Sequence, residues 1–128
     1  MQSKFFNHQG ASLHYQIGGK EAAPVMVLLH GGFGSISDFE PLLPRLLQHY
    51  RVIAVDTRGH GRSTLGTAAL TYAQAAEDAR QILRHEGVEK YSLFGLSDGG
   101  TTAYRLGAAD KNIGKIITVG AEWHKKHL

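Results

Sequence analysis

Short apolar runs alternate with longer amphipathic stretches along most of the 128 residues. The runs are rich in Val, Ile and Leu, which is typical of strands buried on both faces of a parallel sheet. They occupy residues 25–30, 51–56, 90–95 and 115–120. The pattern therefore predicts four strands of one sheet.

The stretches between these runs predict helices. Residues 72–87 follow a helical period, with Thr71 placed to cap the first turn and Gly87 placed to end the last. One stripe of this helix carries Ala75, Ala79, Ile82, Leu83 and Glu86. Residues 99–110 predict a second helix.

A third helix is predicted within SDFEPLLPRLLQHY, capped by Ser37 or Asp38, with Pro44 delaying its start. Before the first buried run, residues 4–7 and 12–17 predict a hairpin with its turn at Gln9-Gly10. The order is a hairpin, three strand–helix units and a last strand. This order predicts an α/β fold, a mostly parallel sheet with helices on both faces.

Composition limits the possible functions. The chain is long enough for one domain, 1–128, and its net charge of +3 is too small to indicate nucleic-acid binding. With no cysteine, disulfides and thiolate metal sites are excluded. The first ten residues lack the features of a signal peptide, and no apolar run is long enough to span a bilayer. We expect a cytoplasmic protein with no membrane partner, no metal and no cofactor.

The segment GLSDGG joins a predicted strand to a predicted helix and places Ser97 between Gly95 and Gly99. A G-x-S-x-G turn in this context is a nucleophile elbow, which exposes a serine hydroxyl at a helix N-terminus. The other interpretation is a plain glycine-rich turn. The context favours Ser97 as a catalytic nucleophile.

The segment HGGFGS follows the first buried run. Acyl transfer needs N–H groups aimed at a developing oxyanion, one from the residue after the nucleophile and one from an earlier loop. These would be Asp98 and Gly32, with Phe33 as the alternative to Gly32. HGGFG lacks the spacing of a phosphate-binding loop, which argues against a nucleotide-binding domain. We expect His30 to hold the turn together rather than to act as a base.

The segment DTRGHGRS follows the next buried run. We interpret Asp56 and Arg58 as structural residues that hold this loop in place. A catalytic role for Asp56 is disfavoured because it follows the wrong strand.

These three motifs, in this order and after successive strands, resemble the α/β-hydrolase family. The resemblance covers nearly the whole chain. It implies that Ser97 attacks an ester-like carbonyl of a small molecule by a Ser–His–Asp mechanism. The elbow with Ser97 and Asp98 is most similar to biphenyl hydrolase-like proteins and esterases. That resemblance implies that Asp98 can bind a substrate amine. We name Phe33 as a second substrate-binding candidate. The alternative for Asp98 is a capping role in the helix.

The family has eight strands, with its acid and histidine after the late strands, whereas the pattern here ends after the sixth. We therefore expect an N-terminal portion of a hydrolase that lacks the usual lid and histidine loop, inactive or impaired by itself. Glu122 and His124 are candidate acid and base, and His127 lies close by. A polar solvated tail is the favoured interpretation of these residues.

Two further expectations concern partners. The last strand should form an exposed sheet edge through which the chain self-associates. A non-catalytic small-ligand-binding protein on the same scaffold is the alternative function, because a fold alone does not decide an activity.

Overall fold

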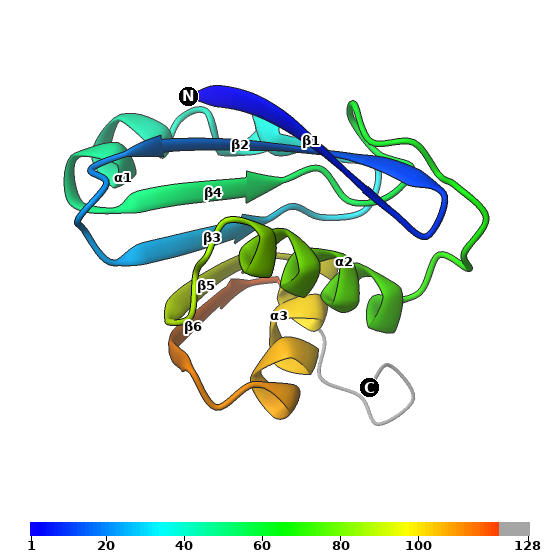
Figure 1. Cartoon of the computed structure of the whole chain (residues 1–128). Coiled ribbons are helices and arrows are strands. Elements are labelled where there is room, and N and C mark those ends of the chain that lie inside the picture. The colour runs from blue at the N-terminus through cyan, green and yellow to red at the C-terminus, as the bar shows by residue number, and fades with distance from the viewer. Residues whose placement is uncertain (121–128) are drawn as a thin grey trace.

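The computed structural model describes residues 1–120. Six strands form one sheet in the order β1-β2-β4-β3-β5-β6 (Figure 1). The strands are β1 (Gln2–His8), β2 (Ala11–Gly19), β3 (Val25–Leu29), β4 (Arg51–Val55), β5 (Tyr91–Leu96) and β6 (Ile113–Val119). All six predicted strands are present, with each end shifted by two residues at most.

Parallel pairing joins the four strands of the strand–helix units. β3 pairs in parallel with β4 and β5, and β5 pairs in parallel with β6. β1 and β2 form the predicted antiparallel hairpin, and β2 also pairs antiparallel with β4. At the hairpin turn Gln9 and Gly10 have φ values of 50° and 74°, the left-handed conformation that a tight hairpin turn requires.

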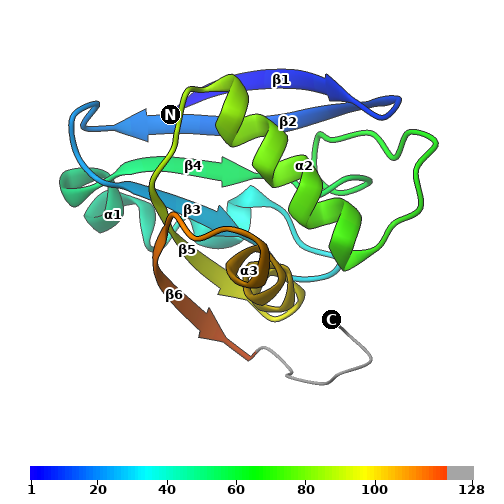
Figure 2. The same ribbon diagram turned by 60° about the horizontal axis from the view of Figure 1, so that its bottom comes forward.

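Helices cover both faces of the sheet. α2 (Tyr72–His85) and α3 (Asp98–Ala109) lie on one face, and α1 (Leu43–His49) lies on the other (Figure 2). Alternate residues of each inner strand supply the two cores. In β3, Val27 and Leu29 pack in the cluster under α2 and α3, whereas Met26 and Leu28 pack in the cluster with α1. The predicted fold class is therefore confirmed.

The start of α1 differs from the prediction. Ser35, rather than Ser37 or Asp38, provides the first cap, on a short 3₁₀ helix, η1 (Ile36–Phe39), in which Asp38 completes a capping box. The α-helix begins only at Leu43, with Pro44 in its first turn. Proline fits there because first-turn N–H groups have no intrahelical partner, so the predicted delay is confirmed.

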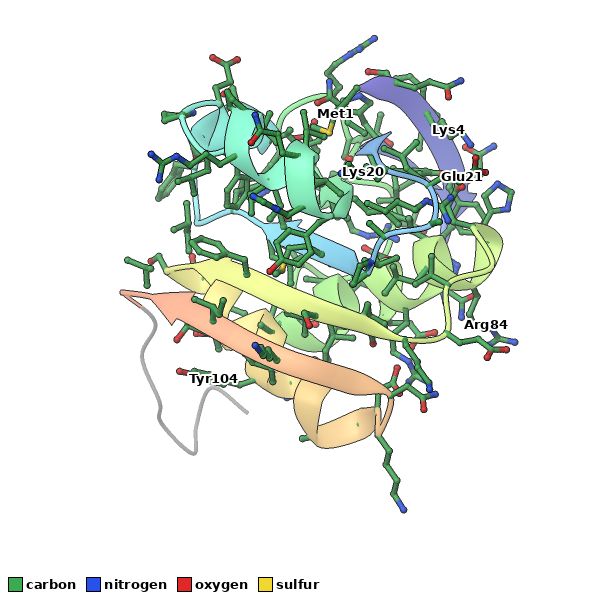
Figure 3. The ribbon with its side chains drawn as sticks, turned by 90° about the vertical axis from the view of Figure 1, so that its left-hand side faces the viewer. Met1, Lys4, Lys20, Glu21, Arg84 and Tyr104 are labelled. Carbon is green, nitrogen blue, oxygen red and sulfur yellow. The ribbon has the colours of Figure 1, made fainter. Side chains whose placement is uncertain are left out.

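Within the described residues β6 is an outer strand of the sheet, beside β5 (Figure 3). Its apolar residues Ile116, Ile117 and Val119 are 37%, 42% and 55% exposed. Tyr104 of α3 bonds to Thr118 at 2.7 Å between the two hydroxyl oxygens, so α3 is fixed against this strand. Self-association through the edge stays a prediction.

Candidate active site

Ser97 lies at the turn from β5 into α3. Its φ and ψ are 51° and −114°, outside the conformations that non-glycine residues usually adopt. The Ser97 N–H donates to the Val119 carbonyl at 2.8 Å, and the Ser97 carbonyl accepts from Gly100 N–H at 2.9 Å. Both bonds hold the strained residue, whose side chain is exposed. The backbone therefore has the strained, exposed geometry of an elbow.

The two glycines around Ser97 are required by close contacts. A Cβ added to Gly99 would lie 2.1 Å from the Leu29 carbonyl oxygen. A Cβ added to Gly95 would lie 2.5 Å from Gly100 N. Real Cβ atoms do not approach other atoms so closely, so the G-x-S-x-G spacing follows from the packing of Gly95 on the start of α3 and of Gly99 on the end of β3.

The loop after β3 lies beside Ser97. A Cβ added to Gly31 would lie 3.2 Å from Ser97 Cβ. In the loop, Gly34 N–H donates to the Gly31 carbonyl at 3.2 Å, and Phe33 has a φ of 59°. Positive φ at this third position is what a type II turn requires. Within residues 1–120 the N–H groups of Gly32 and Phe33 donate to no acceptor, so both remain candidates for the oxyanion hole.

His30 holds this loop and is itself fully engaged. Its ring is buried, Nδ1 donates to the Gly31 carbonyl at 2.6 Å, and Nε2 accepts from Thr57 N–H at 2.9 Å. Burial lowers the pKa of His30, an effect that the bond to Gly31 only partly opposes. A neutral ring with both nitrogens occupied agrees with the predicted structural role.

Asp98 does not cap its helix. Ser97 occupies the cap position, and Asp98 stands in the first turn, where an acid suits the helix dipole. Its Oδ1 accepts from the Tyr72 hydroxyl at 2.8 Å. Its Oδ2 lies over Gly32, because a Cβ added there would be 2.5 Å away. The capping interpretation is thus corrected. The Tyr72 partner was missed because 26 residues separate the pair.

A cleft of about 1110 Å³ opens beside the elbow. Its walls come from residues 30–34, residues 57–61, the start of α2 and the first half of α3. Asp98 and Phe33, the two predicted substrate-binding residues, both line it, and the Phe33 side chain is fully exposed. Ser97 itself is not a lining residue, but Asp98 and Gly99 directly after it are.

Asp56 and Arg58 anchor the loop after β4, as predicted. Asp56 Oδ1 accepts from Ile36 N–H at 2.9 Å, and Oδ2 accepts from Arg62 N–H at 3.0 Å and from His14 Nδ1 at 2.6 Å. Burial raises the pKa of Asp56, but these hydrogen bonds outweigh it and the pKa is lowered overall. One carboxylate therefore ties both loops of the cleft to β2.

Arg58 is buried and forms a double hydrogen bond with Asp78 of α2, from Nε to Oδ2 and from Nη2 to Oδ1, each at 3.0 Å. Sequence reasoning missed both Asp78 and His14. Each is a polar residue inside an otherwise apolar pattern, and that mismatch is the signal that could have revealed them.

The described residues do not complete a catalytic triad at Ser97. Within residues 1–120 the Ser97 hydroxyl has no hydrogen-bonded histidine. The candidates Glu122 and His124 lie outside the described residues. Over the same 1–120 range no cluster of three His, Asp or Glu side chains is arranged to hold a metal. No helix of this range is long and apolar enough to cross a bilayer.

Comparisons with known proteins point to one family. Residues 24–128 match the alpha/beta hydrolase fold family. The chain is 38% identical over 101 residues to 3-oxoadipate enol-lactonase 1 of Acinetobacter baylyi, covering 79% of this chain and 38% of that protein. It is 39% identical over 105 residues to proline iminopeptidase PfmaB of Pestalotiopsis fici, covering 78% and 37%.

Among solved structures, a carboxylesterase study of Nitrososphaera gargenis provides a chain with a TM-score of 0.89 and 27% identity, covering 96% of this chain and 48% of that one. The chain thus spans less than half the length of these relatives.

Proposed function

We propose that this chain, which belongs to the α/β-hydrolase fold family, provides the nucleophile and the oxyanion hole of a serine hydrolase that acts on ester-like bonds of small molecules. The observation that carries the proposal is the strained elbow at Ser97, with φ of 51°, packed against a loop with two unpaired N–H groups. Strain of this kind persists where the surrounding structure holds it for a function.

In the proposed reaction Ser97 Oγ attacks the carbonyl carbon, and the oxyanion accepts hydrogen bonds from the N–H of Asp98 and that of Gly32 or Phe33. Asp98 is the first residue of α3, where no intrahelical carbonyl is available to its N–H. The base that takes the Ser97 proton comes from outside residues 1–120, and without it the reaction is impaired.

Asp98 also selects the substrate in this proposal. Its carboxylate lies over Gly32, where it opposes the negative charge of a nearby oxyanion unless a cation compensates. A positively charged group on the acyl part would provide that compensation, with Phe33 covering its apolar part. Asp98→Asn keeps the backbone N–H and should reduce the preference for cationic over neutral acyl esters.

The test is labelling of the chain with a fluorophosphonate probe, resolved by peptide mass spectrometry, with and without added imidazole as an external base. We expect slow labelling of Ser97 that imidazole accelerates and that Ser97→Ala abolishes. Ser37→Ala, which removes another exposed serine, should leave Ser97 labelling unchanged. A folded sample that stays unlabelled at Ser97 even with imidazole would favour the non-catalytic ligand-binding alternative.

A matched pair of variants distinguishes the two oxyanion donors. Gly32→Ala and Gly32→Pro both add a Cβ near Asp98, but only proline removes the N–H. Removing an oxyanion-hole donor typically slows a reaction by about 100-fold or more. If Gly32 donates, Gly32→Pro should label about 100-fold more slowly than Gly32→Ala. Equal rates would assign the donor to Phe33.

A further inference from the structure

A hydrogen-bonded Ser–His–Asp chain exists within residues 1–120, and it does not involve Ser97. Asp56 Oδ2 lies 2.6 Å from His14 Nδ1, and His14 Nε2 lies 3.0 Å from Ser3 Oγ. Ser3 is on β1 and His14 on β2, where Ser3 pairs with Gln16 and Phe5 pairs with His14. Diagonal neighbours of this kind share one face of a hairpin, which brings the hydroxyl and the ring together.

The proton positions in this chain follow from its partners. Asp56 also accepts two backbone N–H groups, from Ile36 and Arg62, and these bonds favour its ionised form. An ionised Asp56 places the ring proton of a neutral His14 on Nδ1. His14 Nε2 is then an acceptor that faces the Ser3 hydroxyl. Each role in the chain therefore matches that of a serine, a general base and an orienting acid.

Solvent reaches this hydrogen-bonded Ser–His–Asp series from the Ser3 end only. The side chains of His14 and Asp56 are each 3% exposed, whereas Ser3 is exposed on the surface. The half-exposed Phe5 ring lies 5.1 Å from the His14 ring, and the Arg62 guanidinium lies 5.2 Å above Phe5. A reagent reaching Ser3 thus meets an apolar ring and a cation.

We infer that Ser3 is a second reactive serine, deprotonated by His14 and open to acylation or phosphonylation by activated reagents. With a fluorophosphonate, the Ser3 Oγ–phosphorus bond forms and the phosphorus–fluorine bond breaks. Fluoride leaves with the bonding electron pair, and the Ser3 proton passes to His14 Nε2 and then to water. Ser3 stands within an extended strand and not in an elbow at a helix N-terminus. The modified serine therefore accumulates, because the site does not release the bound group.

This site is separate from the proposed active site. β1 and β5 have β2, β4 and β3 between them, and Figure 3 shows Lys4 of β1 at the end of the sheet opposite to β6. The inference does not rest on the function proposed for Ser97. Peptides that contain Ser3 and Ser97 are read separately, so one proposal can fail while the other holds.

The experiment measures fluorophosphonate labelling of individual peptides of the folded 128-residue chain. Ser37 is the internal reference, because it is an exposed serine whose Oγ is bonded at 2.7 Å to the hydroxyl of Ser35, with no histidine. A general base contributes about 100-fold or more to such a step. We expect the Ser3 peptide to label about 100-fold faster than the Ser37 peptide, and His14→Gln to remove that difference.

His14 is buried, so His14→Gln can also perturb folding. Two further measurements avoid this difficulty. Unfolding the unaltered protein in urea should reduce Ser3 labelling to the level of Ser37. Gln16→Ala, which removes only a 3.4 Å contact to Ser3 Oγ, should keep the fast rate. Labelling of Ser3 within threefold of Ser37 in the folded chain would overturn the inference without reference to any variant.

Discussion

Replacing Arg58 with methionine should destabilise the fold by about 3–5 kcal/mol. Arg58 is 1% exposed, and it donates to both carboxylate oxygens of Asp78 at 3.0 Å. It also donates to the carbonyl oxygens of His8, Gln9 and Leu65 at 2.8, 3.0 and 3.1 Å. Methionine fills similar space but donates nothing. The expected loss is therefore that of leaving one charge of a buried pair without its partner.

The assay is urea unfolding followed by circular dichroism, with Arg80→Met as the matched control. Arg80 is on the same helix as Asp78, but its side chain is 41% exposed and lies 3.8 Å from Glu77. An exposed pair contributes about 0–1 kcal/mol, so the control should change stability little. If Arg58→Met lowers the unfolding free energy by less than about 1 kcal/mol, or by no more than Arg80→Met does, then Arg58 does not hold the loop after β4 in place.

Three residues near the elbow and one on the sheet edge give further predictions. Gly99→Ala should lose at least about 2 kcal/mol and abolish Ser97 labelling, because its Cβ would lie 2.1 Å from a backbone oxygen; unfolding and labelling with wild-type values would contradict this. Phe33→Gly should raise the unfolding free energy by up to about 1 kcal/mol, since it relieves a φ of 59° and uncovers no buried surface; a clear loss in urea unfolding would show that the ring packs. Asp56 has a lowered pKa, so its ionised form stabilises the fold above the unfolded pKa of about 3.9, and this contribution is lost as pH falls through the folded pKa. The unfolding free energies of wild type and Asp56→Asn, measured in urea, should therefore differ more at pH 7 than below pH 4. A difference that does not change with pH would contradict a stabilising role for the Asp56 charge. Ile117→Lys should weaken concentration-dependent association in sedimentation, because a charge on an edge strand discourages strand pairing; a wild-type chain that stays monomeric at all concentrations would exclude association through this edge.

Most of the fold could be predicted because its signals are local. The apolar runs gave four strands and the hairpin pattern gave the other two, and Thr71 accepts from Gln74 N–H at 3.0 Å as the cap of α2. The first helix was misplaced because three candidate caps stand within four residues of one another. Ser35 is the cap, since only from there can the backbone N–H of the cap residue donate to the Asp38 carboxylate and complete a capping box.

The elbow was equally predictable, because its glycine spacing is dictated by contacts within a few residues and with the adjoining strand. The polar pairs that anchor the loops could not be predicted in this way. His14 bonds to Asp56 across 42 residues and Arg58 to Asp78 across 20. Pairs of this kind depend on which strands become neighbours, and periodicity gives no information about that. The choice between Gly32 and Phe33 as the proposed oxyanion donor is also not set by sequence, since both N–H groups stand in one turn.

The anchors explain how glycine-rich loops can form a defined cleft. The loops at residues 30–34 and 57–61 have few apolar side chains to bury, so the hydrophobic effect alone cannot fix them. Asp56 compensates by accepting N–H groups from both sides of the cleft, through Ile36 and Arg62. Because these bonds go to the backbone, they set the position of the chain itself rather than of a side chain. The position of the loop that approaches Ser97 at Gly31 thus depends on a buried carboxylate that does not line the cleft.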